Sequence, residues 1–337
     1  MRLFPNQDIM EIEDPIYGKA DIKEPALIDI LNSSEVLRLH DINQFGVPEK
    51  WYGHDLRNFS RYDHSVGVFM LLRKLNASLE EQIAGLTHDV SHRVFSHVSD
   101  WILGSQENED GQDRAHKKFL YDSSLKKIIE RNGLSIERIA NHHSFSLLEK
   151  EIPELCADRI DYCLRELYYN QNMIDPKFLA NSLISYQGKI IFNDIMQAEL
   201  FGVSFMNLQN THWGSADKSI RFYLLADVIK TAISSHKLKS RDLWKTDSYV
   251  VKILENSGNQ KIINRLSLLE YGFKFIKDQE NPEINIQKKF RYVNPAFLDK
   301  QEVKYLMDVD ENYKKFVEES KESNKRGIRG RIVPKKH

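Results

Sequence analysis

The sequence predicts a mainly α-helical globular protein with small β-hairpin elements and a mixed α/β region towards its C-terminal end. Apolar residues recur at helical spacing through most of its central part. The composition, with 41% hydrophobic and 29% charged residues, is that of an ordinary globular protein. We expect an N-terminal segment (1–47) packed on a helical core (48–235). A mixed C-terminal region (236–337) follows, ending in a basic tail that we expect to be mobile.

The first elements can be placed from capping residues and apolar spacing. Residues 1–32 mix short extended stretches with turn residues, and Ser33-Ser34-Glu35 predicts the cap of a short helix that Gly46-Val47-Pro48 ends. From His64 onward the apolar spacing predicts a helix. A capping box at Ser78 and Glu81 opens the next helix, which we expect to end near 91–92.

The later elements follow from loops, a proline and a change of period. Residues 104–115 are polar and predict a loop, and 123–132 predict a short helix. A long helix is expected to begin near Pro153 and to run past Leu167. Alternating apolar residues at 183–192 predict a hairpin that turns at Gln187-Gly188. Helices are expected again over 195–235, and Phe290-Arg291-Tyr292-Val293 resembles a strand.

Charge, hydropathy and cysteine content exclude several functions. A formal net charge of −1 gives no general attraction to nucleic acid or anionic lipid, so a nucleic-acid partner is unlikely. No apolar run approaches the roughly 20 residues that cross a bilayer, so no membrane association is expected. The two cysteines form no disulfide framework, which favours a cytoplasmic location.

Two histidines and two aspartates form the strongest candidate site. His88-Asp89 is expected at a helix end, where both side chains can reach one ion, and His64 and Asp158 are expected on two other helices. Imidazole with carboxylate suits a divalent transition metal, and four such ligands leave positions open for catalysis. A His-Asp pair alone is common and usually binds no metal. The assignment of a metal site therefore also depends on the residues around the pair.

Several polar residues around this set could serve catalysis or only the fold. His92, His97, Asp100 and His116 lie nearby, and a histidine among them could donate a proton to a leaving oxygen. At least one of these histidines is expected to be structural. A polar stripe of the long helix begins at the metal-ligand candidate Asp158, and its spacing fits a pocket wall or a solvated face equally well.

Five ordered motifs lie over residues 14–166 of the chain. The motifs are Asp14-Pro15-Ile16-Tyr17-Gly18; Arg38-Leu39-His40-Asp41-Ile42-Asn43-Gln44-Phe45-Gly46; Arg61-Tyr62-Asp63-His64-Ser65-Val66-Gly67-Val68; His88-Asp89-Val90-Ser91-His92-Arg93-Val94-Phe95-Ser96-His97; and Asp158-Arg159-Ile160-Asp161-Tyr162-Cys163-Leu164-Arg165-Glu166. In order as well as in residue type they resemble the HD superfamily of metal-dependent phosphohydrolases, in particular its deoxynucleoside triphosphate triphosphohydrolase-like branch.

The resemblance implies an HD-domain helical core and assigns roles to thirteen residues. A divalent metal (Mn, Fe, Zn, Co or Mg) would be held, and a water that it activates would attack the phosphorus next to the nucleoside oxygen. The products would be a nucleoside and polyphosphate. The implied metal ligands are His64, His88, Asp89 and Asp158; the catalytic residues are His116, oriented by Asp100, with His92 and His97 facing the phosphates; Arg61, Arg159 and Tyr162 would contact phosphate, and Gln44 and Glu166 the sugar hydroxyl.

The sequence departs from the family in the residues that hold the substrate. The Arg and Tyr that the family usually carries after the hairpin align with Leu208 and Ala216, leaving His212 as a remnant. Glu166 replaces an Asp, and Arg93 brings an extra cation. The implied function is hydrolysis of a nucleotide phosphoester. The alternatives are a phosphodiesterase or phosphomonoesterase on the same scaffold and a non-catalytic nucleotide-binding sensor. Relatives in this branch commonly assemble, which makes a homo-oligomer one candidate state, but the sequence alone does not fix the oligomeric state.

Overall fold

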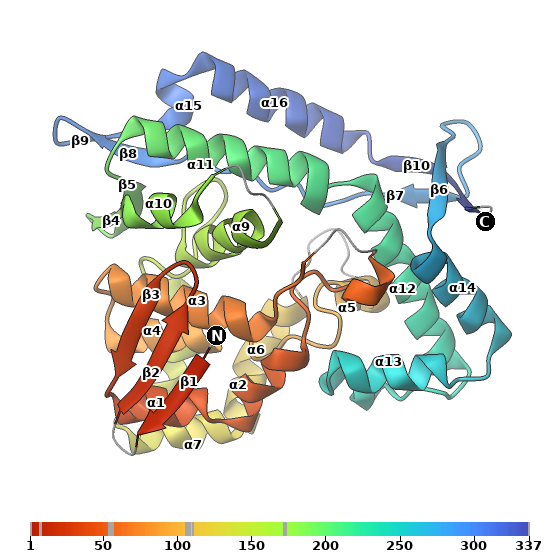
Figure 1. Cartoon of the computed structure of the whole chain (residues 1–337), viewed down its shortest axis with the longest axis horizontal. Coiled ribbons are helices and arrows are strands. Elements are labelled where there is room, and N and C mark those ends of the chain that lie inside the picture. The colour runs from red at the N-terminus through yellow and green to blue at the C-terminus, as the bar shows by residue number, and fades with distance from the viewer. Residues whose placement is uncertain are drawn as a thin grey trace.

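The computed structural model describes residues 2–6, 9–52, 57–104, 109, 111–170 and 174–335. Helices predominate, and three small sheets lie at the edges of the helical body (Figure 1). The mainly α fold with small β elements is therefore confirmed. None of the helices in these ranges is both long and apolar enough to cross a bilayer.

The N-terminal segment forms an antiparallel sheet and two short helices. Strands β1 (Arg2–Asn6), β2 (Ile9–Asp14) and β3 (Gly18–Ile22) pair in sequence order. Helix α1 (Pro25–Leu31) follows, and α2 (Ser34–Arg38) begins where the Ser33 hydroxyl accepts from Val36 N, as its sequence predicts. In Figure 1 this sheet lies beside α3 and α4.

Two packed helices, α3 (Arg61–Lys74) and α4 (Leu79–Thr87), carry much of the candidate site. Helix α3 begins three residues before His64, because Ser60 and Asp63 form a capping box there. Helix α4 ends at Thr87, short of the expected 91–92. Only half of its expected capping box forms: Ser78 caps the helix, but the Glu81 carboxylate accepts from Leu147 N and Leu148 N instead.

The middle of the chain differs from expectation at two helix starts. Residues 111–115, expected in a loop, begin α6 (Gly111–Asp122), whereas 105–108 and 110 lie outside the described residues. The long helix α9 (Ala157–Asn170) starts four residues after Pro153, which sits in a turn. The remaining short elements of this part are η1 (Leu39–Asp41), η2 (Glu49–Trp51), α5 (Val98–Leu103), α7 (Ser124–Arg131), α8 (Ile136–Ile139), η3 (His142–Ser144) and α10 (Pro176–Asn181).

The predicted hairpin is present and joins a larger sheet. Strands β4 (Leu183–Tyr186) and β5 (Lys189–Phe192) turn at Gln187 and Gly188, which both have positive φ. Strand β5 pairs in parallel with β8 (Ala296–Asp299), and β8 pairs with β9 (Glu302–Tyr305). This sheet therefore ties the C-terminal region to the middle of the chain.

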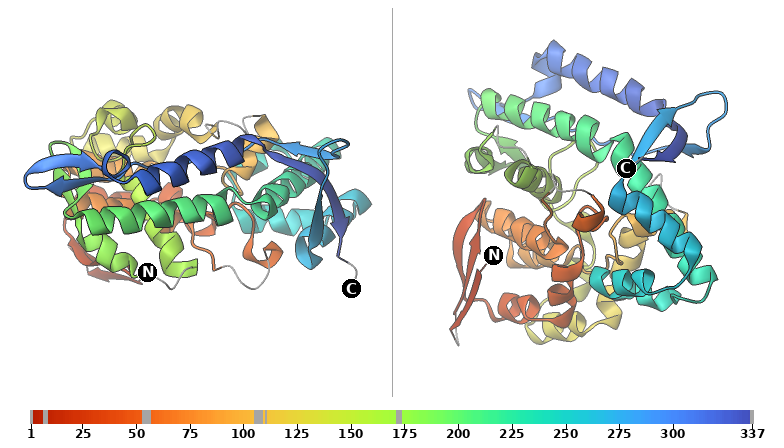
Figure 2. Two further views of the ribbon diagram at one scale, coloured as in Figure 1. Left: turned by 90° about the horizontal axis from the view of Figure 1, so that it is seen from above. Right: turned by 45° about the vertical axis from the view of Figure 1, so that its right-hand side comes forward.

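Long helices form the side of the molecule on which the C-terminal region packs. Helix α11 (Ile195–Leu208) continues as a π-helix, η4 (Gln209–Trp213), and α12 (Ala216–Ser234) follows. Helix α16 (Glu311–Lys325) packs along α11, as both views of Figure 2 show. The Tyr313 ring lies against Gly202, where an added Cβ would be 2.9 Å from the ring.

The C-terminal region holds one correction: Phe290–Val293 is extended but pairs with none of the described strands. In the basic tail, β10 (Ile328–Pro334) lies between β6 (Phe273–Lys277) and β7 (Ile284–Ile286), and the mobility of the tail stays a prediction. The remaining elements are η5 (Ser240–Trp244), α13 (Asp247–Glu255), α14 (Gln260–Tyr271) and α15 (Leu306–Val309). One apolar core contains residues from all three predicted segments, whose boundaries stay a prediction.

Candidate metal centre

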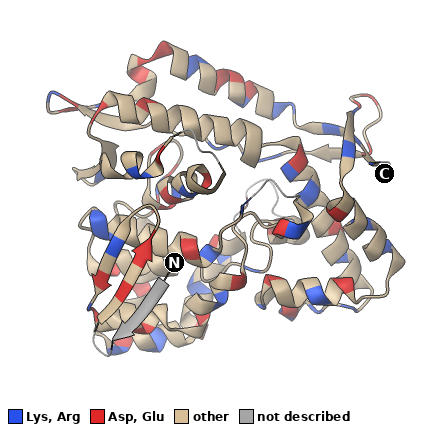
Figure 3. Ribbon diagram, viewed as in Figure 1, with Lys and Arg blue, Asp and Glu red and all other residues tan. Residues whose placement is uncertain are grey.

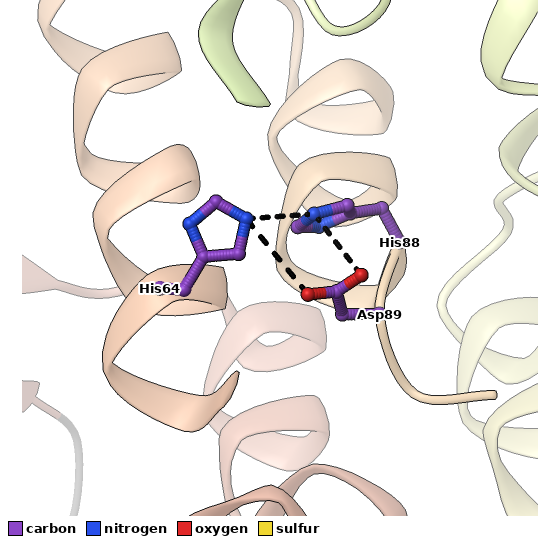
Figure 4. A group of neighbouring side chains, drawn as sticks. All are labelled: His64, His88 and Asp89. Atoms are coloured by element: carbon purple, nitrogen blue, oxygen red, sulfur yellow. Dashed lines mark hydrogen bonds and ion pairs between the residues drawn. The ribbon is translucent and has the colours of Figure 1, made fainter. Parts of the chain in front are cut away.

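His64, His88 and Asp89 converge between α3 and α4 because α4 stops at Thr87. His88 caps that helix, and the turn that follows aims its side chain and that of Asp89 towards His64 (Figure 4). The two Nε2 atoms lie 3.3 Å apart, and Asp89 oxygens lie 3.8 Å from His64 Nε2 and 3.5 Å from His88 Nε2. One donor atom from each residue lies within 4.8 Å of the other two, so this group could hold a metal ion.

Asp158 brings a fourth donor from α9. Its Oδ1 lies 2.9 Å from His64 Nε2 and 3.5 Å from His88 Nε2. The structure thus brings all four sequence-predicted ligands together from two helices, α3 and α9, and from the C-terminal end of a third, α4. The Asp158 side chain is 24% exposed, whereas the other three are almost completely buried. The centre therefore opens on the Asp158 side.

Hydrogen bonds fix which nitrogen each imidazole presents to the centre. His64 Nδ1 donates to Asp161 Oδ2 at 2.8 Å, and His88 Nδ1 donates to the Gly85 carbonyl at 2.7 Å. A ring whose Nδ1 carries a proton has its Nε2 lone pair available for a metal, and such outer partners are usual for metal-ligating histidines. Both rings are therefore held in the tautomer that the centre needs.

The charge balance at the centre favours a cation. Burial alone would lower the pKa of His88, but the Asp89 and Asp158 carboxylates raise it to about 9. Burial would raise the pKa of Asp89, yet Arg61 and His88 hold it well below its usual range. Without a metal the carboxylates retain protons on the imidazoles; a divalent ion would take the place of these protons. The residues present thus fit such an ion.

A buried ion network supports His64 from behind. Asp161 also accepts from Arg165 Nε at 2.8 Å, and the other end of that guanidinium donates to Asp14 Oδ2 at 2.6 Å. These three side chains are at most 1% exposed. At Gly67 an added Cβ would lie 1.9 Å from Arg165, so only glycine leaves room for the network. The polar stripe of α9 is therefore no solvated face.

A cavity of about 130 Å³ adjoins the metal centre. This volume is smaller than the roughly 300 Å³ of pockets that enclose drug-sized ligands. Arg61 projects into it and donates to Asp89 at 2.7 Å. The lining residues are Gln44, Arg61, His88, Asp89, His92, His97, Glu109, Gln112, Asp113, His142, Glu149, Ile152, Asp158, Arg159, Tyr162, Lys289 and Arg291.

His92 and His97 both line the cavity, but they have different partners. His92 Nε2 lies 3.2 Å from Asp89 Oδ1, and burial together with Arg61 lowers the pKa of His92 to about 3. His97 Nδ1 donates to Asp100 Oδ2 at 3.0 Å. His97 thus has the oriented arrangement of a proton donor, with Asp100 fixing its tautomer.

The expected pairing of Asp100 with His116 is wrong. His116 Nδ1 lies 3.2 Å from the Ser91 hydroxyl, and its Nε2 lies 2.9 Å from His142 Nε2. His116 is buried and is absent from the cavity wall, where His142 stands instead. The difference arises because Asp100 Oδ1 accepts from Gly111 N, where α6 begins, while His116 lies more than one turn further along.

The expected substrate contacts are only partly at the cavity. Gln44, Arg159 and Tyr162 line it, and the buried Gln44 Oε1 accepts no hydrogen bond from the described residues. Arg159 is held by the Glu154 and Lys150 carbonyls. Glu166 is absent from the wall, because its carboxylate accepts from Trp213 Nε1 at 3.0 Å and from Asn170 at 3.1 Å.

Sequence reasoning missed eight residues of the cavity wall: Glu109, Gln112, Asp113, His142, Glu149, Ile152, Lys289 and Arg291. His142 could have been suspected from its place shortly before the last motif. No periodicity marks Lys289 or Arg291, which lie more than 120 residues after Asp158. Only the three-dimensional path of the C-terminal region brings these two cations to the metal centre.

Comparisons with known proteins agree with this site. The family model described as "HD domain" matches residues 61–166, which include all four ligands. The uncharacterized protein YdhJ of Bacillus subtilis is 33% identical over 332 residues, covering 96% of this chain and 99% of its own. The metal-dependent phosphohydrolase cns2 of Cordyceps militaris is 29% identical, covering 86% and 85%.

More distant relatives extend the comparison. A protein named deoxynucleoside triphosphate triphosphohydrolase SAMHD1 homolog, of Dictyostelium discoideum, is 22% identical over 88% of this chain and 62% of its own. The crystal structure of a hypothetical protein from Aquifex aeolicus shares the fold with a TM-score of 0.65 at 19% identity, over 91% of this chain and 93% of that one. The matched family model, the relatives over nearly the whole chain and the converging ligands lead to one conclusion: this chain belongs to the HD-domain family of metal-dependent phosphohydrolases.

Proposed function

We propose that the protein hydrolyses a nucleotide phosphoester, and that its substrate is a (deoxy)nucleoside triphosphate cleaved to nucleoside and polyphosphate. The observation that carries this proposal is the convergence of His64, His88, Asp89 and Asp158 beside a cavity lined by arginines and histidines. The name of the Dictyostelium relative supports the choice of substrate. A cofactor of one divalent ion, Mn, Fe, Zn, Co or Mg, belongs to the proposal.

The candidate ligands and several other residues at the cavity have roles in this proposal. A divalent ion held by the four ligands would activate water and offset the charge on the phosphoryl oxygens. His97, oriented by Asp100, donates the proton that the leaving nucleoside oxygen requires. Arg61 and Arg159 neutralise phosphate charge, and Tyr162 donates a hydrogen bond to it. The Gln44 Oε1 atom, which accepts no hydrogen bond from the described residues, meets a sugar hydroxyl.

In this proposal His116 and Glu166 position other side chains and do not contact the substrate themselves. His116 lies against His142 and holds that ring at the cavity wall. Glu166 fixes Trp213, whose ring lies edge-on to Tyr162 at 5.1 Å between centroids. We also propose that the protein acts in the cytoplasm as a homo-oligomer, which light scattering can test.

A phosphomonoesterase acting on a small substrate is the second candidate. The cavity volume of about 130 Å³ favours it, because this space does not enclose a whole nucleotide. One experiment separates the two. Purified protein with Mn²⁺ is incubated with dNTPs, NTPs, nucleoside monophosphates and an aryl phosphodiester, and the products are identified by mass. Deoxynucleoside with tripolyphosphate supports the first candidate, and inorganic phosphate from monophosphates alone supports the second. Tight nucleotide binding without any product would overturn both and indicate a sensor.

A further inference from the structure

A short extended segment of the C-terminal region, residues 288–294, runs beside the cavity and is here called the strap. It pairs with no strand, yet it is held along its length by the residues around it. Asn324 of α16 donates to the Lys288 carbonyl at 3.0 Å, and Tyr313 of the same helix donates to the Val293 carbonyl at 2.8 Å. Arg291 N donates to the Gln209 side chain in η4 at 3.3 Å.

The strap is also fixed at its far end. Asn294 N donates to the Pro153 carbonyl at 2.9 Å, just before α9, and the Val293 side chain is completely buried. Contacts with α16, with η4 and with the turn before α9 thus leave the backbone little freedom. The side chains of Lys289 and Arg291 are consequently fixed at the wall that also holds the metal ligands.

Lys289 and Arg291 determine whether the net charge of the cavity is positive or negative once a divalent ion is bound. Five carboxylates (Asp89, Glu109, Asp113, Glu149 and Asp158) and four permanent cations (Arg61, Arg159, Lys289 and Arg291) line it among the described residues. With neutral histidines the net charge is −1, and a divalent ion makes it +1. Without Lys289 and Arg291 the charge would remain −1 even with the ion bound. A polyanionic substrate would then be repelled from the cavity.

Arg291 differs from Arg61 in its ion-pair partner. Its guanidinium pairs with Glu109, which is not a ligand, whereas Arg61 contacts the ligand Asp89 directly. Burial opposes the charge on Glu109, but Arg291 lowers the pKa of this carboxyl to about 2. Burial and the positive charge of Arg291 also lower the pKa of Lys218 to about 8. Arg291 thus brings positive charge to the cavity wall through a pair with Glu109, which is not a candidate metal ligand.

We propose that Lys289 and Arg291 bind the distal phosphates of a polyphosphate substrate, and that Glu109 occupies Arg291 until such a phosphate replaces it. This inference rests on the proposed phosphohydrolase function and narrows its substrate class to phosphoesters with more than one phosphate. It accounts for the loss of the family's Arg and Tyr at Leu208 and Ala216, since the strap supplies cations from elsewhere in the chain. Entry of the phosphate chain separates Glu109 from Arg291 and enlarges the small cavity.

The test measures binding of tripolyphosphate and of inorganic phosphate to the Mn²⁺-loaded protein by calorimetry. Arg291→Met keeps the bulk of the side chain and removes its charge, so tripolyphosphate binding should weaken about 10- to 100-fold, as expected for a lost charged hydrogen bond. Lys289→Ala should weaken it less. Lys288→Ala is the matched control, because Lys288 lines a separate cavity beside α16. Inorganic phosphate, bound at the metal, should change less than threefold in each variant.

The Glu109→Gln substitution should change the affinity for tripolyphosphate in the opposite direction. Removing this competing carboxylate frees Arg291, so tripolyphosphate should bind several-fold more tightly, whereas a purely structural ion pair would give weaker or unchanged binding. Equal tripolyphosphate affinity in the wild-type and Arg291→Met proteins would overturn the inference. Such a result would not decide the proposed function, which the product assay tests separately. Conversely, a protein that binds tripolyphosphate through Arg291 but releases no product would reject the proposed function and retain this inference.

Discussion

Replacing Arg165 by methionine should destabilise the protein and weaken its metal centre together. Arg165 is 1% exposed and joins Asp14 at 2.6 Å to Asp161 at 2.8 Å, so its loss leaves two buried carboxylates without their cation. Removal of one partner from a buried ion pair costs about 3–5 kcal/mol. Since Asp161 also orients His64, metal affinity should fall roughly 10- to 100-fold, as for other outer-shell partners.

Two measurements and one control test this reasoning. Urea denaturation with a constant slope gives the change in unfolding free energy, and calorimetric titration with Mn²⁺ gives the dissociation constant. Arg131→Met is the control, because Arg131 and Asp29 form an ion pair of similar length, 2.7 Å, with side chains 59% and 36% exposed. Such a surface pair contributes about 0–1 kcal/mol. An Arg165→Met protein that loses no more stability than Arg131→Met, with unchanged metal affinity, would refute the network's role.

Three further predictions concern the centre itself. His88→Ala and Asp158→Ala should each abolish both bound metal and turnover; stoichiometric metal in both purified proteins, measured by mass spectrometry, would contradict the ligand set. His97→Ala should retain metal and lose rate by about 10²–10⁴-fold, while His116→Ala should lose less; equal losses would show that His116 shares the proton transfer. Mn²⁺ at 100 times its dissociation constant should stabilise the wild type by about 2.7 kcal/mol in denaturation and should leave His88→Ala unchanged.

The four candidate metal ligands could be selected from the sequence because each belongs to a local motif. His88 and Asp89 are adjacent, and His64 and Asp158 each begin a recognisable helical stretch, so residue type and order sufficed to select them. The structure adds what spacing leaves open: α4 stops at Thr87, and that early end turns His88 towards His64. A few competing hydrogen bonds decide where a helix ends, which explains why the predicted end of α4 was several residues late.

The histidine that pairs with Asp100 was not predictable in the same way. Asp100 lies three residues from His97 and sixteen from His116, and both pairings were compatible with the sequence. The choice depends on where α6 begins, since Gly111 N takes the second Asp100 oxygen, where an added Cβ would lie 2.4 Å away. That start falls within a stretch of Gly, Asp, Glu and Gln which predicts a loop. Local propensity thus gave the wrong structure for residues 111–115, and with it the wrong partner for Asp100.

The strap shows why substrate contacts are the hardest part of such a site to predict. A metal ligand needs one of a few side chains in a fixed geometry, whereas phosphate charge can be neutralised by any lysine or arginine that the fold brings near. The positions after the hairpin lack the family's Arg, whereas Lys289 and Arg291 of the strap line the cavity, on a backbone held by Tyr313, Asn324 and Gln209. On our proposal that these cations bind phosphate, a charge lost at one wall is supplied at another without any change in the candidate metal ligands, and the length of the phosphate chain that the cavity accepts can differ.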